Sequence, residues 1–269
     1  MPTLRTAHPI IGDPPRKALY LATSTPLRID AEGESLLLRR SAQATARYPL
    51  ARIDRIVCNR HADWSGNALA LCLARGIPLV WVDGHGTALG TALGSAGPRL
   101  ATAQPFDALL DSYLERPDWC SHYDNWLKRR RLDILVLTAL RATHAGQPMS
   151  QADFDEYKRV YVYNAQLDPV FPELARAWCY AFVVKQLAVA AIANTYWAYD
   201  GQPLNLADDL FGLLWAELNL EAASIAVAAD QTRTQLLLVE SWIARHPGRL
   251  PEHLARFRRH LAHENQQWP

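Results

Sequence analysis

The stretch that decides the fold begins with Ile53-Asp54-Arg55-Ile56-Val57 and continues with Ile77-Pro78-Leu79-Val80-Trp81-Val82 and Asp83-Gly84-His85-Gly86. The second segment is an apolar run of strand length, which is typical of a strand buried on both faces. Between the two runs, residues 68–74 are apolar and helical in character, and Gly76 can end that helix in a left-handed conformation. The glycines of the last segment supply the positive φ that a tight turn needs. The stretch therefore predicts strand, short helix, buried strand, turn and strand.

The chain changes character near residue 100. Before it, further short apolar runs at 18–21, 27–29 and 36–38 alternate with turn residues. The segment Gly94-Ser95-Ala96-Gly97-Pro98 has the composition of a linker. After it the pattern is helical, with expected helices at about 105–115, 121–144, 153–163, 171–198, 206–228, 230–245 and 251–265. We predict an α+β protein with a small β-sandwich-like N-terminal domain holding one embedded helix (1–97), followed by an all-helical C-terminal domain (98–269).

The composition excludes several classes of protein. Of the 269 residues, 49% are hydrophobic and 20% are charged, which is globular rather than disordered. The formal net charge is +1, so any surface that binds nucleic acid must be local. The four cysteines are widely spaced, which indicates a reduced cytoplasmic protein without a structural zinc site. The most apolar stretch, 177–198, is interrupted by polar residues, so we expect a buried helix and no membrane segment.

The order and residue types of the stretch from 49 to 90 resemble the N-terminal domain of the CRISPR-associated Cas-one (Cas1) family. Proteins of that family are adaptation endonucleases and integrases that capture foreign DNA fragments and insert them into the CRISPR array. The resemblance implies that the N-terminal sheets form a dimer contact and that the helical domain holds the active site. The partners it implies are double-stranded DNA fragments, the small Cas-two (Cas2) protein, and a second copy or an active sibling of this chain.

The resemblance also implies a Mg²⁺ or Mn²⁺ site built from carboxylates and a histidine. The family pattern ends in Asp-Leu-x-x-Glu, and Leu204 to Leu210 match its apolar lead-in, with Asp209 at the principal ligand position beside Asp208. Gly212 stands where the family has the second carboxylate, and residues 194–201 contain no histidine. Asp208 and Asp209 equally suit an acidic helix start, which the helix dipole favours.

The early glutamate of the pattern is also missing, and Asp133 is the one carboxylate on the corresponding segment 130–137. We therefore predict Asp209, Asp208 and Asp133 as relic or weak catalytic residues, with Asp209 and Asp208 as the metal ligands if a metal binds. Other ligands remain open, namely His144, Glu156, Glu173 and Glu217.

Two basic clusters lie in the segment expected to be helical. They comprise Lys128, Arg129, Arg130 and Arg131 in one run, and Arg256, Arg258 and Arg259 near the C-terminus. Such charges bind phosphates without reading sequence, although they also suit solvated helix faces paired with acids. We predict them as DNA-binding residues.

Three functions follow from these expectations. The first is a spacer-acquisition protein of the Cas-one type that binds DNA through a structural subunit with a degraded metal site. The second is an active metal-dependent endonuclease and integrase with unconventional ligands. The third is an interaction scaffold without a DNA role.

Overall fold

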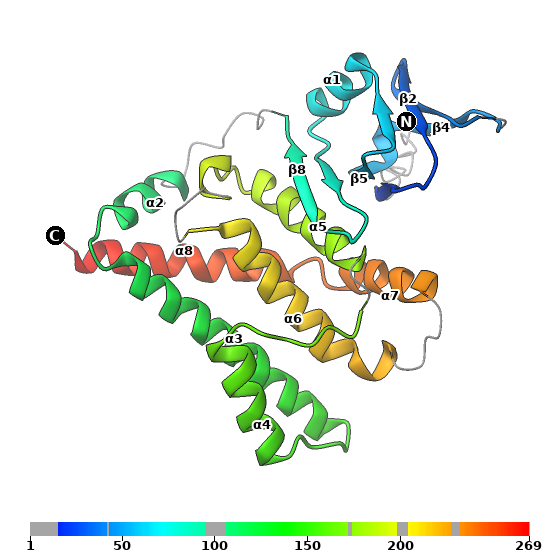
Figure 1. Ribbon diagram of the computed structural model, residues 1–269. Helices are drawn as coiled ribbons and strands as arrows, with labels where there is room; N and C mark the ends of the chain where they lie inside the picture. The colour runs from blue at the N-terminus through cyan, green and yellow to red at the C-terminus, as the bar shows by residue number, and fades with distance from the viewer. Residues whose placement is uncertain are drawn as a thin grey trace, which may run out of the picture.

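The computed structural model describes residues 16–41, 43–94, 106–171, 174–197, 204–226 and 232–268. It has the expected α+β architecture, in which two small sheets precede a helical lobe (Figure 1). The segment 95–105, which includes most of the expected linker, lies outside the described residues. No helix in the described part of the chain is both long and apolar enough to cross a lipid bilayer.

Each sheet has four strands. The first, sheet A, has the order β1 (Lys17–Leu21), β5 (Ile53–Asn59), β7 (Leu79–Val82) and β8 (Ala88–Ala92). The second, sheet B, has the order β4 (Ala46–Pro49), β3 (Ser35–Arg39), β2 (Leu27–Glu32) and β6 (Ala62–Trp64). In sheet A the first three strands are parallel, and β8 closes one edge in an antiparallel pairing. The expected turn at 83–86 forms, and Gly86 has a positive φ there; Gly33, between β2 and β3, has a positive φ as well.

Sheet A is covered on both faces, as the apolar run 77–82 predicts. Ile56 and Leu79 belong to a core shared with sheet B and α1 (Gly66–Ala74). Val57 and Val80 point the other way, into the core of the helical lobe, where α5 packs against β5 and β7. Successive strand residues alternate between faces, so one strand serves two cores.

The short helix α1 has the predicted end. Gly76 has φ +64°, and the amides of Gly76 and Ile77 donate to the carbonyls of Leu73 and Cys72. This left-handed termination satisfies carbonyls that the last turn would leave open. It also turns the chain directly into β7.

The helical lobe contains the following elements: α2 (Phe106–Leu114), α3 (Trp119–His144), α4 (Gln151–Tyr157), the π-helical turn η2 (Lys158–Tyr163), α5 (Leu174–Val189), the 3-10 turn η3 (Asn194–Tyr196), α6 (Leu206–Ala226), α7 (Thr232–Arg245) and α8 (Arg249–Gln267). The long helices α3 and α6 pack side by side, α8 crosses them and packs against α2 and α6, and α4 folds back on the far end of α3 (Figure 1).

One predicted boundary was wrong. The helix expected over 171–198 ends at Val189. Ala191 takes a left-handed φ of 55°, and the amide of Ile192 donates to the carbonyl of Leu187 at 3.2 Å. Alanine rarely adopts this conformation, and no glycine marks the site, so the residue types alone do not reveal this helix end.

A polar junction joins the two parts of the molecule. The buried Arg55 of β5 donates to Glu240 of α7 at 3.0 Å and to Asp54 at 3.1 Å. Tyr20 stacks on Trp178 of α5 with ring centroids 3.6 Å apart, and Lys185 pairs with Asp54. Sheet A therefore rests on α5 and α7 in a defined position.

Candidate functional site

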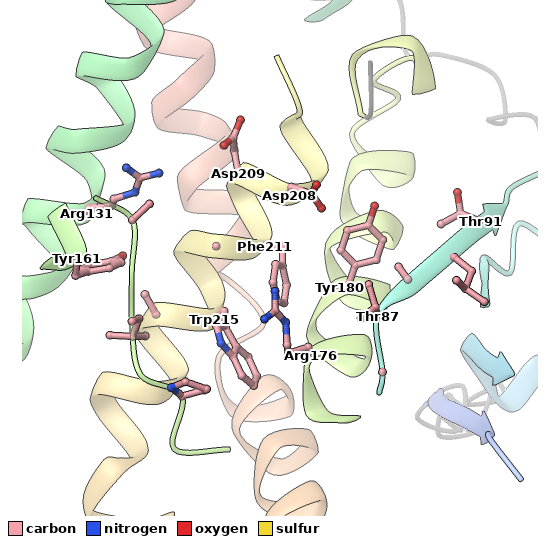
Figure 2. Close-up of a pocket in the computed structure, with 18 of the residues that line it drawn as sticks. Thr87, Thr91, Arg131, Tyr161, Arg176, Tyr180, Asp208, Asp209, Phe211 and Trp215 are labelled. Atoms are coloured by element: carbon pink, nitrogen blue, oxygen red, sulfur yellow. The ribbon is translucent and has the colours of Figure 1, made fainter. Parts of the chain in front are cut away.

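A cavity of about 740 Å³ lies where the edge strand β8 meets the helical lobe (Figure 2). We call it the Asp209 cavity. Its wall is made by β8, by α3, α5 and α6, and by the extended segment 164–171, which we call the strap. The lining side chains that carry charge or an aromatic ring are Arg131, Tyr161, Arg176, Tyr180, Asp208, Asp209, Phe211 and Trp215.

The two aspartates stand at the start of α6. Asn205 precedes the helix, and its side-chain oxygen accepts a hydrogen bond from the amide of Asp208 at 3.2 Å. This is the capping contact that begins a helix, and it places Asp208 and Asp209 in the first turn. Acidic residues are favoured there because the helix dipole is positive at its N-terminus.

Asp209 is held by the helix opposite. The Tyr123 hydroxyl of α3 donates to its Oδ2 at 2.8 Å. Burial raises the pKa of Asp209 to about 6, although the Tyr123 hydrogen bond and the positive charge of Arg131 lower the pKa in part. Tyr123 and Arg131 are eight residues apart on α3, which puts them close to one face of that helix. Arg131 extends toward Asp209 in Figure 2.

The other side of the cavity is an aromatic wall. Phe211 and Trp215, one turn apart on α6, have ring centroids 5.9 Å apart, and Tyr180 of α5 meets Phe211 edge-on at 6.0 Å. The guanidinium of Arg176 lies over the Phe211 ring at 5.4 Å from its centroid. Guanidinium groups and aromatic faces together suit a phosphate with its base.

The described residues do not fit a divalent metal ion at Asp209. A Mg²⁺ or Mn²⁺ site needs several oxygen donors that converge, with room for water. In the described part of the chain no three His, Cys, Asp or Glu side chains are placed to hold a metal ion. Asp208 is the acidic neighbour of Asp209 in this cavity, and the other groups that act on the Asp209 carboxylate are a phenol, which already donates to it, and the Arg131 cation. Of residues 194–201, where the family pattern would have its histidine turn, residues 198–201 lie outside the described residues.

The structure places Asp133 apart from Asp208 and Asp209. Asp133 pairs with Arg130, and its Oδ2 lies 3.9 Å from Nη1 of Arg256 on α8. It lines a second cavity, of about 340 Å³, between α3 and α8, which we call the arginine cavity. Its other lining residues are Trp126, Arg129, Arg130, Leu132, Arg256, Arg259 and His260.

The predicted basic residues thus separate into two groups. Arg129, Arg130, Arg256 and Arg259 meet at the arginine cavity, whereas Arg131 faces the Asp209 cavity. Lys128 is paired with Asp124 at 2.5 Å on the surface of α3, and Arg258 lies on α8. Successive residues of a helix point about 100° apart, so one basic run cannot serve one surface.

The remaining candidate ligands lie elsewhere. Glu156 pairs with Arg159 at 2.5 Å on the surface, and His144 is an exposed residue at the end of α3. Glu217 is buried and lies 3.4 Å from Nε2 of His253. Glu173 lies outside the described residues.

Sequence reasoning missed Tyr123, which donates to Asp209, and Arg176, which lines the same cavity. Tyr123 and Arg176 stand on helices far from Asp209 in the chain, and nothing local marks either as part of a site. The sequence held one usable signal for Tyr123, which is its helical spacing. Tyr123 and Arg131 are eight positions apart, an interval that puts two residues close to the same face of a helix. Phe211 and Trp215 follow Asp209 on the same helix and could have been grouped with it.

The chain matches the family model of the CRISPR associated protein Cas1 over residues 19–105. No curated protein sequence matches it. Among solved structures, TM1797, a CAS1 protein from Thermotoga maritima, has a TM-score of 0.63 at 11% identity, and the match covers 91% of this chain and 97% of that chain.

The TtCas1–DNA complex has a TM-score of 0.58 at 15% identity, with 91% of each chain covered. A Cas6-RT-Cas1–Cas2 complex has a TM-score of 0.53 at 14% identity over 79% of this chain and 28% of that chain. At these identities the likeness shows the fold. The chain is therefore similar to Cas1 proteins in its family-model match over residues 19–105 and in the fold that continues from it.

Proposed function

We propose that this chain is a DNA-binding subunit for CRISPR spacer acquisition whose metal site has degraded. The proposal rests on the environment of Asp209. The Tyr123 hydroxyl and the Arg131 guanidinium lie beside its carboxylate, at positions where a metal site would need further acidic ligands. A solved relative is a complex of TtCas1 with DNA, which supports a DNA ligand here as well.

The charge around Asp209 supports the loss of the metal. A divalent cation balances the negative charges of its ligands and of a phosphate. Arg131 supplies a fixed positive charge at this place, and Arg176 a second one across the cavity. The two positive charges of Arg131 and Arg176 balance the two negative charges of Asp208 and Asp209, so the carboxylates are neutralised without a metal ion. A phosphate in this cavity would then be bound by the guanidinium groups.

The arginine cavity supports contact with the DNA backbone. Arg129, Arg130, Arg256 and Arg259 line it together with the carboxylate of Asp133, and Glu252, outside the lining, pairs with Arg256 at 2.6 Å, so the arginines outnumber these acids. Burial is the main cause that lowers the pKa of Arg130, and the positive charges of Arg256 and Arg259 lower it further, whereas Glu252 and Glu217 raise it. Excess guanidinium charge in a half-open cavity is the environment in which a phosphate is favoured.

Assembly and location complete the proposal. We infer a homodimer or a heterodimer with an active sibling, formed through the N-terminal domain (1–97), while the helical domain (98–269) handles DNA. A relative in complex with Cas2 supports a Cas2-type partner. We also infer a cytoplasmic location, as expected for a chain with free, separated cysteines.

DNA binding is tested by its dependence on salt. The double variant Arg129→Ala/Arg259→Ala should lower the slope of log affinity against log salt by about 2, because each lost phosphate contact removes about one released counterion. The control is Arg28→Ala/Arg39→Ala, which removes two exposed arginines of sheet B and so lowers the net charge by the same amount. Its salt slope should equal that of the wild type. If the wild-type protein does not bind duplex DNA at low salt, the chain is a scaffold without a DNA role.

The state of the metal site is tested by cleavage and strand-transfer assays on branched and duplex DNA with Mg²⁺ or Mn²⁺. We expect no product from the purified chain and the same DNA affinity with and without the ion. Metal-dependent product that disappears in Asp209→Ala would contradict the proposal and identify the chain as an active integrase. The observation that favours an active integrase is that Asp208 and Asp209 both line the cavity.

A further inference from the structure

A third cavity, in the form of a groove, lies on the far side of the strap from the Asp209 cavity. Its volume is about 380 Å³, and it opens between α3, α4, the turn η2, the strap and α6. Its lining includes Thr138 of α3, the apolar residues Val160, Val170 and Leu220, and side chains of α4 and the strap. We call it the acidic groove, because its charged lining residues are all carboxylates.

The groove is preformed by the anchoring of the strap. Asn219 of α6 is buried, and its side-chain oxygen accepts the amides of Val170 at 2.7 Å and Phe171 at 3.2 Å. At the other end Ala165 has a left-handed φ of 55°, and its amide donates to the carbonyl of Tyr161. A segment tied at both ends keeps its shape before a ligand arrives, which reduces the ordering cost of binding.

The floor of the groove is apolar and its edge is negative. Val160, Val170 and Leu220 are partly exposed hydrophobic residues on three different elements. Asp153 and Glu156 on α4 and Asp168 on the strap supply the carboxylates. The Ser150 hydroxyl donates to Asp153 at 2.7 Å. Arg159 donates to both carboxylate oxygens of Glu156 and balances its charge, so Asp153 and Asp168 carry the negative charge of the edge.

This chemistry selects one kind of occupant. The carboxylates of Asp153 and Asp168 repel a phosphate backbone, so the groove does not continue the DNA surface of the arginine cavity. Apolar contact with opposite charges at the rim is the arrangement by which grooves hold amphipathic peptide segments. We propose that the acidic groove is a docking site for a partner protein, which inserts a segment carrying hydrophobic residues flanked by lysine or arginine.

The probe is a fluorescein-labelled amphipathic peptide of leucine and lysine, with a peptide of leucine and glutamate in the same order as its counterpart. The full chain should bind the lysine peptide and not the glutamate peptide. Asp153→Asn/Asp168→Asn should weaken binding about three- to tenfold, since each rim carboxylate contributes as a partly exposed ion pair does. Thr138→Phe, which fills the groove from α3, should weaken it as well.

Asp124→Asn/Asp155→Asn is the matched control, because it removes two exposed carboxylates of the same lobe that do not line the groove. Its peptide affinity should stay within about twofold of the wild-type value. Equal weakening by both pairs, or equal binding of both peptides, would overturn the proposal. A change of oligomeric state with Asp153→Asn/Asp168→Asn would identify the occupant as a second copy of this chain and overturn it too. Circular dichroism checks that each variant is folded.

Discussion

At the scale of single residues, Asp209 is a destabilising group near neutral pH. Its folded pKa is raised to about 6, mainly by burial, from an ordinary value of 3.8. A raised carboxyl pKa means that the folded state binds a proton more tightly than the unfolded state does. The resulting stabilisation is complete below pH 4 and is lost as the pH rises through about 6.

Asp209→Asn should therefore increase the free energy of unfolding at pH 7 by about 1–3 kcal/mol and leave it nearly unchanged at pH 3.5. The amide oxygen of asparagine can still accept the Tyr123 hydrogen bond. Urea unfolding of both proteins at the two pH values measures the difference. A variant that is less stable than the wild type at pH 7 would contradict this account.

Tyr123 stabilises the charged form of Asp209 because it donates a hydrogen bond to the carboxylate. Tyr123→Phe removes that donor, so the pKa of Asp209 should rise further above 6. A titration followed by carboxyl ¹³C chemical shifts measures the change. Tyr157→Phe, at an exposed tyrosine of α4, is the control that should leave the Asp209 titration unchanged.

At the scale of elements, the strap is the shared wall of two cavities. Ala165 and Pro169 line the Asp209 cavity, Asp168 and Val170 line the acidic groove, and Leu167 lines both. An extended chain presents alternate residues to opposite sides, so any shift of the strap changes both cavities. A partner docked in the acidic groove, as proposed above, would affect the Asp209 cavity by this route.

Asn219→Ala should loosen the strap. It leaves the amides of Val170 and Phe171 without their acceptor and removes the bond that Asn219 donates to the carbonyl of Trp215 at 2.8 Å. Buried donors without acceptors cost about 1–3 kcal/mol, so we expect a loss of about 2–4 kcal/mol in unfolding free energy.

Hydrogen exchange should show this effect as faster exchange at Val170 and Phe171, while the amides of β5 stay protected. Asn164→Ala, at an exposed asparagine of the same strap, should change neither stability nor exchange. Similar effects of the two variants would show that Asn219 is not the anchor.

At the scale of the whole molecule, the junction at Arg55 holds the sheets against the helical lobe. The Arg55 side chain is 4% exposed, and Glu240 is one of its two acidic partners. The hydroxyl of Tyr20 also donates to Glu240, at 2.5 Å. Removing one charge from such a network leaves the buried guanidinium only partly compensated.

Glu240→Gln should lower the free energy of unfolding by about 1–3 kcal/mol, because Asp54 keeps part of the compensation. Chemical denaturation measures the loss, and limited proteolysis of the folded variant should cut earlier at the boundary between sheets and helices. Glu32→Gln, which affects an exposed pair with Arg47 at 3.8 Å, should cost less than about 0.5 kcal/mol. Equal losses would mean that the junction does not hold the two parts together.

The sequence by itself determined the local structure of this protein. Apolar runs, helical periodicity and the glycines at 33, 76 and 86 act over a few residues, so they predicted most helices and the buried strand Leu79–Val82. Two short strands, β4 and β6, escaped prediction. All four residues of β4 are exposed, and β6 has only three residues, so neither carries a clear apolar pattern.

Only the tertiary structure decided the character of the site. The sequence placed Asp209 at the start of a helix, but its partner Tyr123 lies 86 residues earlier in the chain. The separation of Arg131 from Arg129 and Arg130, and of Asp133 from Asp209, follows from how α3 is rotated against α6 and α8. Burial and distance between remote side chains set a pKa and the charge of a cavity, and both exist only after the helices have packed.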